Sequence, residues 1–301
     1  MSKIQLTEQL LDTVENQDVN AAENLIKAGA NVNGRRVVDS ATPLIIAAET
    51  ENLKMMKMLL NRGAAVHAMD SDCDSAIHIS ATRGHLEGIK LLMSEGSLAN
   101  IGNIYLATPL MLASTEGYYS IVDYLLKNGV TMQYQVNKNR ESELTLACCS
   151  VGHFDIVKLL LDAADPSRDR KEEINYAILN AMISENASIV RLLLEHEADP
   201  NFSDPNYSQP IFSAIRGNNL EILNLLIAYE ADVNARDIDG YTPLMTAVMV
   251  ENETIVSRLI EAGADVHAEN EESNETVLSL AEERPNKVII ETIRNAMKSS
   301  L

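Results

Sequence analysis

Two adjacent thiols stand near a histidine in the middle of the chain, at Cys148, Cys149 and His153. A nucleophilic cysteine needs a base beside it, so these residue types at this spacing could support thiol-dependent catalysis. A structural interpretation competes with that one. In it, both thiols fill the small-residue positions of a helix and Gly152-His153 forms the turn that follows.

A second candidate for chemistry is the acidic run from Asp70 to Asp74, which places acids at positions 1, 3 and 5 of a possible calcium loop. The sixth position of an EF-hand loop requires glycine and the twelfth requires a bidentate glutamate. The chain has Ser75 and Ala81 there. We therefore expect a solvated acidic loop and no specific calcium site.

The histidines of the chain are far apart in sequence, and none forms an H-E-x-x-H or C-x-x-C arrangement. No glycine-rich phosphate loop is present either. We expect no metal and no cofactor, and we expect that the protein is not an enzyme. The histidines are His67, His78, His85, His153, His196 and His267.

The elements that must hold these residues follow a repeat. Thr-Pro-Leu begins at Thr42, Thr108 and Thr242, at separations close to multiples of 33. A small residue five places after the threonine keeps the same period, at Ala47, Ser80, Ala113, Ala147, Ala181, Ala214, Ala247 and Ala281. A second marker follows each apolar run, at Gly29, Gly63, Gly96, Gly129, Ala164, Glu197, Glu230 and Gly263. Two markers with one period indicate a repeat architecture.

One repeat is readable in physical terms. Thr242 is suited to cap a helix and Pro243 to begin it, because proline has no amide hydrogen to leave unsatisfied. Apolar residues at helical spacing predict a first helix after Thr242 and a second over 255–260, ending before Gly263. Such helices, of about eight to ten residues, are too short to be stable alone. Neighbouring repeats must therefore stack on one another.

The period, the Thr-Pro-Leu helix start and endings such as LIEAGADVHA resemble the ankyrin repeat over Leu6 to Ile293. The resemblance implies an all-α solenoid of about nine helix-turn-helix repeats, with hairpin-like loops called fingers, and protein recognition on the concave face of fingers and first helices. We expect a single domain, 1–301, with an N-terminal cap over 5–33, internal repeats over 34–268 and a C-terminal cap over 269–301. First helices are expected to begin near Glu8, Thr42, Ser75, Thr108, Ser142 or Glu143, Tyr176, Gln209, Thr242 and Thr276.

The fifth and sixth repeats depart most from the pattern, because the fifth has lost the proline and the sixth lacks Thr, Pro and Gly-His. Glu197 and Glu230 also stand where glycine is usual, and a left-handed non-glycine residue costs about 1 kcal/mol. The middle of the array is therefore predicted to be the least stable part.

Composition narrows the function. A formal net charge of −20 repels nucleic acid and favours a partner with a basic surface. No apolar run of about 18 residues predicts a membrane span, and the first residues do not form a secretory signal. Three cysteines, two of them adjacent, indicate a reducing, cytoplasmic location. The polar end, 294–298, favours a monomer.

Partner recognition must use residues that the repeat does not need, and the finger tips are such positions. Exposed tyrosine is enriched among interface anchors, and four fingers carry one: Tyr105, Tyr134, Tyr207 and Tyr241. Basic residues in otherwise acidic fingers are Lys138, Arg140, Arg168, Arg170, Lys171 and Arg236. Each tyrosine has loop packing as an alternative role. The basic residues have the alternative of ordinary solvated loops beside Asp169 and Glu172.

The resemblance also implies a modification, since ankyrin repeats can be substrates of an asparaginyl hydroxylase at the finger-base asparagine eight residues after a leucine. Asn33 and Asn234 match that pattern. Three functional classes remain. We favour a non-catalytic adaptor, scaffold or inhibitor that binds a protein or extended peptide. A host-directed effector of an intracellular bacterium or parasite is the second class, and a thiol enzyme around Cys148, Cys149 and His153 is the third.

Overall fold

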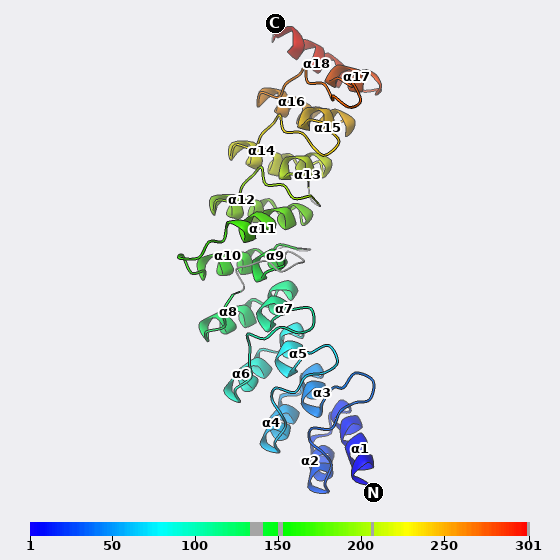
Figure 1. Cartoon of the computed structure of the whole chain (residues 1–301), viewed down its shortest axis with the longest axis vertical. Helices are drawn as coiled ribbons and strands as arrows, with labels where there is room; N and C mark the ends of the chain where they lie inside the picture. The colour runs from blue at the N-terminus through cyan, green and yellow to red at the C-terminus, as the bar shows by residue number, and fades with distance from the viewer. Residues whose placement is uncertain (133–140, 150–152, 206–207, 300–301) are drawn as a thin grey trace. The chain divides into compact units, whose positions relative to one another are not determined.

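A computed structural model of the chain describes residues 1–132, 141–149, 153–205 and 208–299. In these residues the regular secondary structure consists of helices alone, and the helices follow one another in pairs (Figure 1). Within the described residues the only bridges between extended segments are isolated ones, Met69 with Ser75 and Glu269 with Thr276. The predicted all-α fold is confirmed.

The chain divides into two compact units, and each is treated by itself. The first unit contains 1–133 and 158–165, and the second contains 134–157 and 166–301. Helix α10 (Phe154–Asp162) contributes to both.

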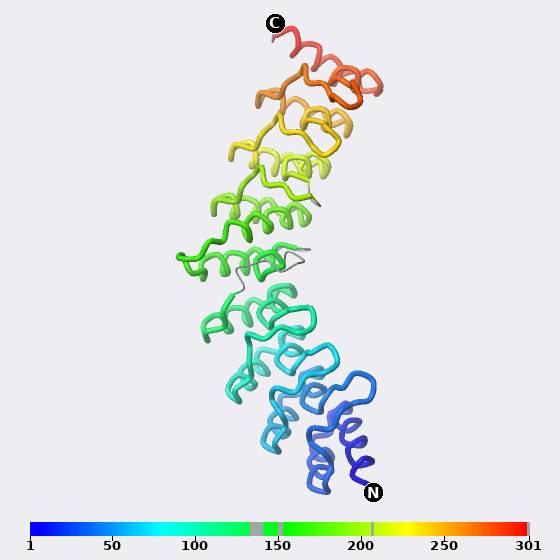
Figure 2. Tube along the Cα trace, in the orientation of Figure 1, coloured from blue at the N-terminus to red at the C-terminus, as the bar shows by residue number. Residues whose placement is uncertain are grey.

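In the first unit, α1, α3, α5 and α7 pack in one row, and α2, α4, α6 and α8 pack in a second row (Figure 2). The first row is α1 (Lys3–Glu15), α3 (Pro43–Glu49), α5 (Ala76–Thr82) and α7 (Pro109–Glu116). The second row is α2 (Val19–Lys27), α4 (Leu53–Asn61), α6 (Leu86–Ser94) and α8 (Tyr119–Lys127).

The second unit repeats this arrangement. Its first helices are α9 (Glu143–Ala147), α11 (Lys171–Ile183), α13 (Pro210–Arg216), α15 (Pro243–Met249) and α17 (Val277–Glu282), each packed against the next. Its second helices are part of α10 together with α12 (Ala187–Glu195), α14 (Leu220–Ala228), α16 (Glu253–Glu261) and α18 (Lys287–Ser299).

The Thr-Pro-Leu interpretation is confirmed in atomic detail. The hydroxyls of Thr42, Thr108 and Thr242 each accept a hydrogen bond from the backbone amide three residues later, at 3.4, 3.2 and 3.3 Å. Proline follows at the first helical position of α3, α7 and α15. The caps satisfy amides that a helix start leaves without partners, and so fix where each repeat begins.

Two helix starts differ from the sequence prediction. Helix α1 begins at Lys3 instead of near Glu8, because Ser2 and Gln5 form a capping box that supports an extra turn. Helix α11 begins at Lys171 instead of near Tyr176. Lys171, which was predicted to lie in a finger, is therefore the first residue of a helix.

The left-handed turns occur as predicted at Glu197 and Glu230, which both have φ of 66°. These two glutamates close their helices where the other repeats use glycine, such as Gly63 and Gly263. The backbone cost expected for a non-glycine residue at this conformation therefore applies in the second unit.

Candidate functional site

Three of the fingers are closed by the same side-chain device. In the second finger, Asp70 Oδ1 accepts hydrogen bonds from the amides of Asp72 and Asp74, both at 2.9 Å. Asn103 and Asp237 repeat this geometry in the third and seventh fingers. A carboxylate or amide that holds its own loop in this way fixes the turn before any partner arrives.

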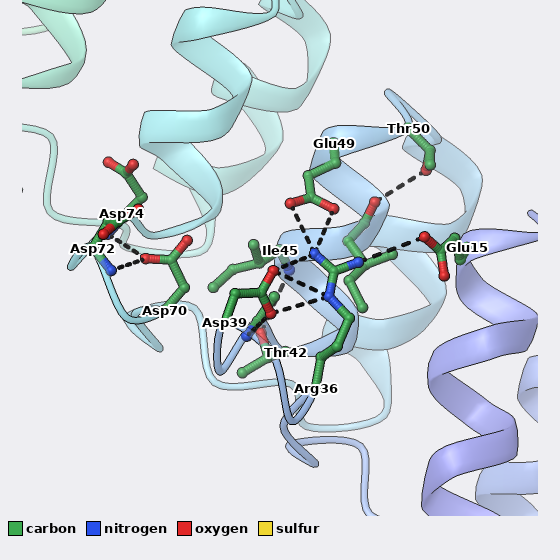
Figure 3. Close-up of polar contacts among 12 residues, drawn as sticks. Glu15, Arg36, Asp39, Thr42, Ile45, Glu49, Thr50, Asp70, Asp72 and Asp74 are labelled. Carbon is green, nitrogen blue, oxygen red and sulfur yellow. Dashed lines mark hydrogen bonds and ion pairs between the residues drawn. The ribbon is translucent and has the colours of Figure 1, made fainter.

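In the acidic run of the second finger, the Asp70 carboxylate therefore holds the loop that contains Asp72 and Asp74 (Figure 3). Asp74 also accepts a hydrogen bond from Asn103 Nδ2 at 2.9 Å, and its partial burial raises its pKa. Among the residues that the structure describes, no group of His, Cys, Asp and Glu is arranged to hold a metal ion.

The first finger is held by an arginine instead. Arg36 Nε lies 3.0 Å from Asp39 Oδ1, and its Nη2 lies 3.4 Å from Glu49 on α3 (Figure 3). A weaker contact of 3.6 Å joins Arg36 to Glu15 at the end of α1. The Arg36 hydrogen bond lowers the pKa of Asp39, whereas partial burial raises the pKa of Glu49. One cation thus joins a finger to two first helices.

Large apolar side chains stand almost fully exposed on these fixed tips. Val37 and Val38 are 95% and 92% exposed in the first finger, and Ile238 is 89% exposed in the seventh. The third finger adds Ile104, Tyr105 and Leu106, which are 50–64% exposed. The apolar residues of the helices are mostly buried and form the core. The exposed apolar side chains of the finger tips contribute little to the packing of the repeats.

The four tyrosines predicted as anchors have different environments. Tyr105 is exposed, whereas Tyr241 is partly buried and donates a hydrogen bond to Glu275 in the next finger. Tyr134 and Tyr207 lie outside the described residues. The loop-packing alternative accordingly describes Tyr241 in the free protein.

The basic residues do not form one exposed island in the described part of the chain. Arg170 is buried and its Nε bonds to Glu173 Oε2 at 2.8 Å, while Lys171 is the first residue of α11. This pairing at i and i+3 accompanies the early start of α11 and withdraws Arg170 from the surface. Arg168, Lys171 and Arg236 are exposed. Lys138 and Arg140 lie outside the described residues.

Asn33 and Asn234 connect adjacent repeats. The Oδ1 of each accepts a 2.7 Å hydrogen bond from an amide of the next repeat, of Ala65 and Asp265 respectively. The Nδ2 of each donates to the carbonyl of Gly63 or Gly263. A hydroxylase would have to act on side chains that are held by the folded array.

The thiols occupy structural positions. Cys148 is fully buried at the end of α9, and burial raises its pKa well above the usual value. Cys149 donates to the Thr145 carbonyl, and its pKa is also raised by burial. The His153 backbone amide donates a 3.0 Å hydrogen bond to the Ala147 carbonyl. A nucleophilic thiol needs a stabilised thiolate, and burial has the opposite effect here.

Sequence reasoning did not select Val37, Val38 or Ile238 as site residues, and it did not identify Arg36 as a link between elements. The sequence did contain a signal for the three apolar residues, because the repeat pattern does not require apolar residues at the finger tips, beside charged ones. The partners of Arg36 on α1 and α3 have no comparable signal.

The family described as ankyrin repeats, in three copies, matches residues 10–104, 99–170 and 174–270. The chain is an ankyrin repeat protein. Ankyrin repeats generally serve as scaffolds for protein–protein interaction. Residues of the described chain form no helix that is long and apolar enough to cross a membrane.

Similar proteins include the B-cell lymphoma 3 protein homolog of Mus musculus, 32% identical over 33% of this chain and 22% of that protein. The putative ankyrin repeat protein FPV031 of Fowlpox virus is 31% identical over 50% of this chain and 46% of that protein. The chain thus matches less than half the length of either. The ankyrin repeat domain of human ASB11 has the same fold, with a TM-score of 0.63, 24% identity and coverage of 75% of this chain and 99% of that one.

Proposed function

We propose that this ankyrin repeat protein is a non-catalytic binding module that recognises a protein or extended peptide with its finger tips and first helices. It would act as an adaptor, scaffold or inhibitor. The observation that carries the proposal is the near-complete exposure of Val37, Val38 and Ile238 on fingers whose loops are already fixed. Apolar side chains held in one geometry lose little entropy on binding, and interface anchors have this property.

The exposed residues predicted from sequence, Tyr105, Arg168, Lys171 and Arg236, belong to the same proposal as contributors to the interface. Tyr134, Tyr207, Lys138 and Arg140 remain predictions outside the described residues. Tyr241 enters as a residue that joins two fingers, and Arg170 as part of the buried pair with Glu173 at the start of α11. Modification at Asn33 and Asn234 also remains a proposal, which intact-mass measurement of protein from a eukaryotic cell would test.

The three cysteines are free thiols, which supports our inference that the protein works in a reducing cytoplasm. We also infer one domain over 1–301, with caps over 5–33 and 269–301, acting as a monomer. Sedimentation of the purified chain tests the last point.

The test of function is capture of partners from a cell lysate by the full chain, followed by quantitative binding of each captured protein. Val37→Ser/Val38→Ser and Ile238→Ser remove finger anchors, and loss of a true anchor weakens binding by at least about 2 kcal/mol. Val288→Ser is the matched control, because Val288 is an exposed apolar residue on α18 and not on a finger. Captured proteins that bind all three variants as tightly as the parent chain would contradict the proposal.

A further inference from the structure

In the second unit, a cavity of about 540 Å³ opens between the sixth finger, which contains 203–205, and the seventh finger, which contains 236–241. Its wall includes Pro205 and Asp204 from the sixth finger and Arg236 and Ile238 from the seventh. The volume lies within the range of pockets that enclose small ligands, so it can receive one or more side chains of a partner.

Ile238 stands at the edge of this cavity and is 89% exposed. Its neighbour Asp237 holds the tip in place, because Asp237 Oδ1 accepts from the amides of Asp239 and Tyr241 at 3.1 and 2.9 Å. Asp237 Oδ2 accepts from Arg216 on α13 at 2.9 Å. The isoleucine therefore projects from a preformed loop next to an open cavity, which is an arrangement suited to an apolar side chain.

The seventh finger is joined by hydrogen bonds to the eighth finger, which contains 269–275. Asn270 Nδ2 donates to the Asp239 carbonyl at 2.8 Å, and the Tyr241 hydroxyl donates to Glu275 at 2.7 Å. The acidic eighth finger thus lies directly beside the finger that carries Ile238. Apolar and acidic features form one continuous surface within the second unit.

Acids dominate this surface. Four exposed residues of the two fingers have carboxylates without a hydrogen bond or ion pair to any described residue, namely Asp239, Glu269, Glu271 and Glu272. The nearby cations are fewer, and Arg216 is already paired with Asp237. Arg236 donates to the Gly240 carbonyl and Arg284 to the Leu280 carbonyl. Unpaired acids of one sign attract a cationic partner and repel an acidic one.

We propose that the surface of the sixth to eighth fingers binds an extended basic peptide segment, placing one apolar side chain in the cavity beside Ile238 and lysine or arginine side chains over Asp239, Glu271 and Glu272. This inference rests on the proposed function and adds the chemistry of the partner. An extended segment fits because the cavity lies between two fingers and three of the four acids lie on the next finger, so successive side chains meet successive fingers.

The experiment is a fluorescence anisotropy titration of the full chain with three labelled peptides of equal length. The first contains a central leucine among lysines, the second replaces the leucine with serine, and the third replaces the lysines with glutamates. We expect the leucine–lysine peptide to bind most tightly and its affinity to fall as salt concentration rises. The serine peptide should bind more weakly and the glutamate peptide should not bind.

Two variants probe the surface. Ile238→Ser removes the apolar anchor, and Glu271→Lys/Glu272→Lys reverses the charge of the eighth finger. Each should weaken the leucine–lysine peptide by roughly tenfold or more. The matched control is Glu195→Lys/Glu261→Lys, which makes the same change of net charge at exposed positions of α12 and α16. It should change affinity by less than about threefold, with circular dichroism showing that all variants fold.

Each other outcome overturns the inference. Equal weakening by the control would mean that the peptide responds only to net charge. Binding of the glutamate peptide, or no binding of the leucine–lysine peptide, would refute a basic partner. The proposed function has a separate readout, because a captured lysate protein that depends on Val37, Val38 or Ile238 supports protein recognition even if the basic peptide fails.

Discussion

The Tyr241 hydroxyl donates a 2.7 Å hydrogen bond to Glu275 Oε2, which joins the seventh finger to the eighth. This bond is lost when the phenol ionises, so it raises the pKa of Tyr241. The raised pKa means that its stabilising effect is present below the unfolded tyrosine value of about 10 and is lost as pH rises through the folded value. We expect Glu275→Gln to bring the Tyr241 absorbance titration to lower pH. Identical titrations in both proteins would contradict the bond.

Arg170 should affect stability and not partner binding. Its side chain and that of Glu173 are 8% and 2% exposed, and removal of one member of a buried ion pair typically costs about 3–5 kcal/mol. Arg170→Ala should therefore lower the urea midpoint of the second unit substantially. Lys171→Ala, at an exposed neighbour, is the control and should be close to neutral. Wild-type stability in Arg170→Ala would return this residue to the list of surface cations.

Arg36 is predicted to contribute to the stability of the first unit. Arg36→Met removes a cation shared by Asp39, Glu49 and Glu15, and we expect a loss of about 1–2 kcal/mol, reduced by solvent screening at these partly exposed groups. Asp39 has a lowered pKa, so its part of this stability is present above about pH 4 and is lost as pH falls through the folded pKa. Urea denaturation at several pH values measures both effects. A variant whose stability loss is the same at pH 3 and pH 7 would show that the Arg36–Asp39 bond contributes nothing.

The three cysteines should react in order of accessibility. Cys73 lies partly exposed at a finger tip, whereas Cys148 is fully buried with a raised pKa. Because the thiolate is the reactive form, Cys73 should react first with a disulfide reagent and Cys148 only when the protein unfolds. Mass spectrometry of the labelled peptides gives the order. Rapid labelling of Cys148 in the folded chain would instead support the thiol-enzyme hypothesis.

The fifth and sixth repeats are expected to open most readily. Helix α9 has only five residues, and Glu197 closes the sixth repeat in a left-handed conformation. Native-state hydrogen exchange should show faster exchange in α9 and α11 than in α3, α5 and α7. Stronger protection in α9 and α11 would refute the prediction.

Most of the sequence predictions that the structure confirms depend on interactions between residues within one helical turn of each other. A threonine cap and the proline that follows act within one helical turn, so α3, α7 and α15 begin as expected. The left-handed turns at Glu197 and Glu230 follow from the same short-range pattern. The predicted start of α11, near Tyr176, was wrong. The helix begins at Lys171, beside the Arg170–Glu173 pair, and the burial of that pair has no signal in the local sequence.

By itself, the sequence determined the repeat, its period, the helix pairs and the ankyrin family, because these depend on residues within about 33 positions of one another. Only the tertiary structure decided which finger residues are free for a partner. Arg170 is buried, Tyr241 bonds to the next finger and Arg36 joins two first helices, whereas Val37, Val38 and Ile238 remain exposed. The physical reason is that the exposure of a finger side chain depends on what the adjacent repeat places beside it.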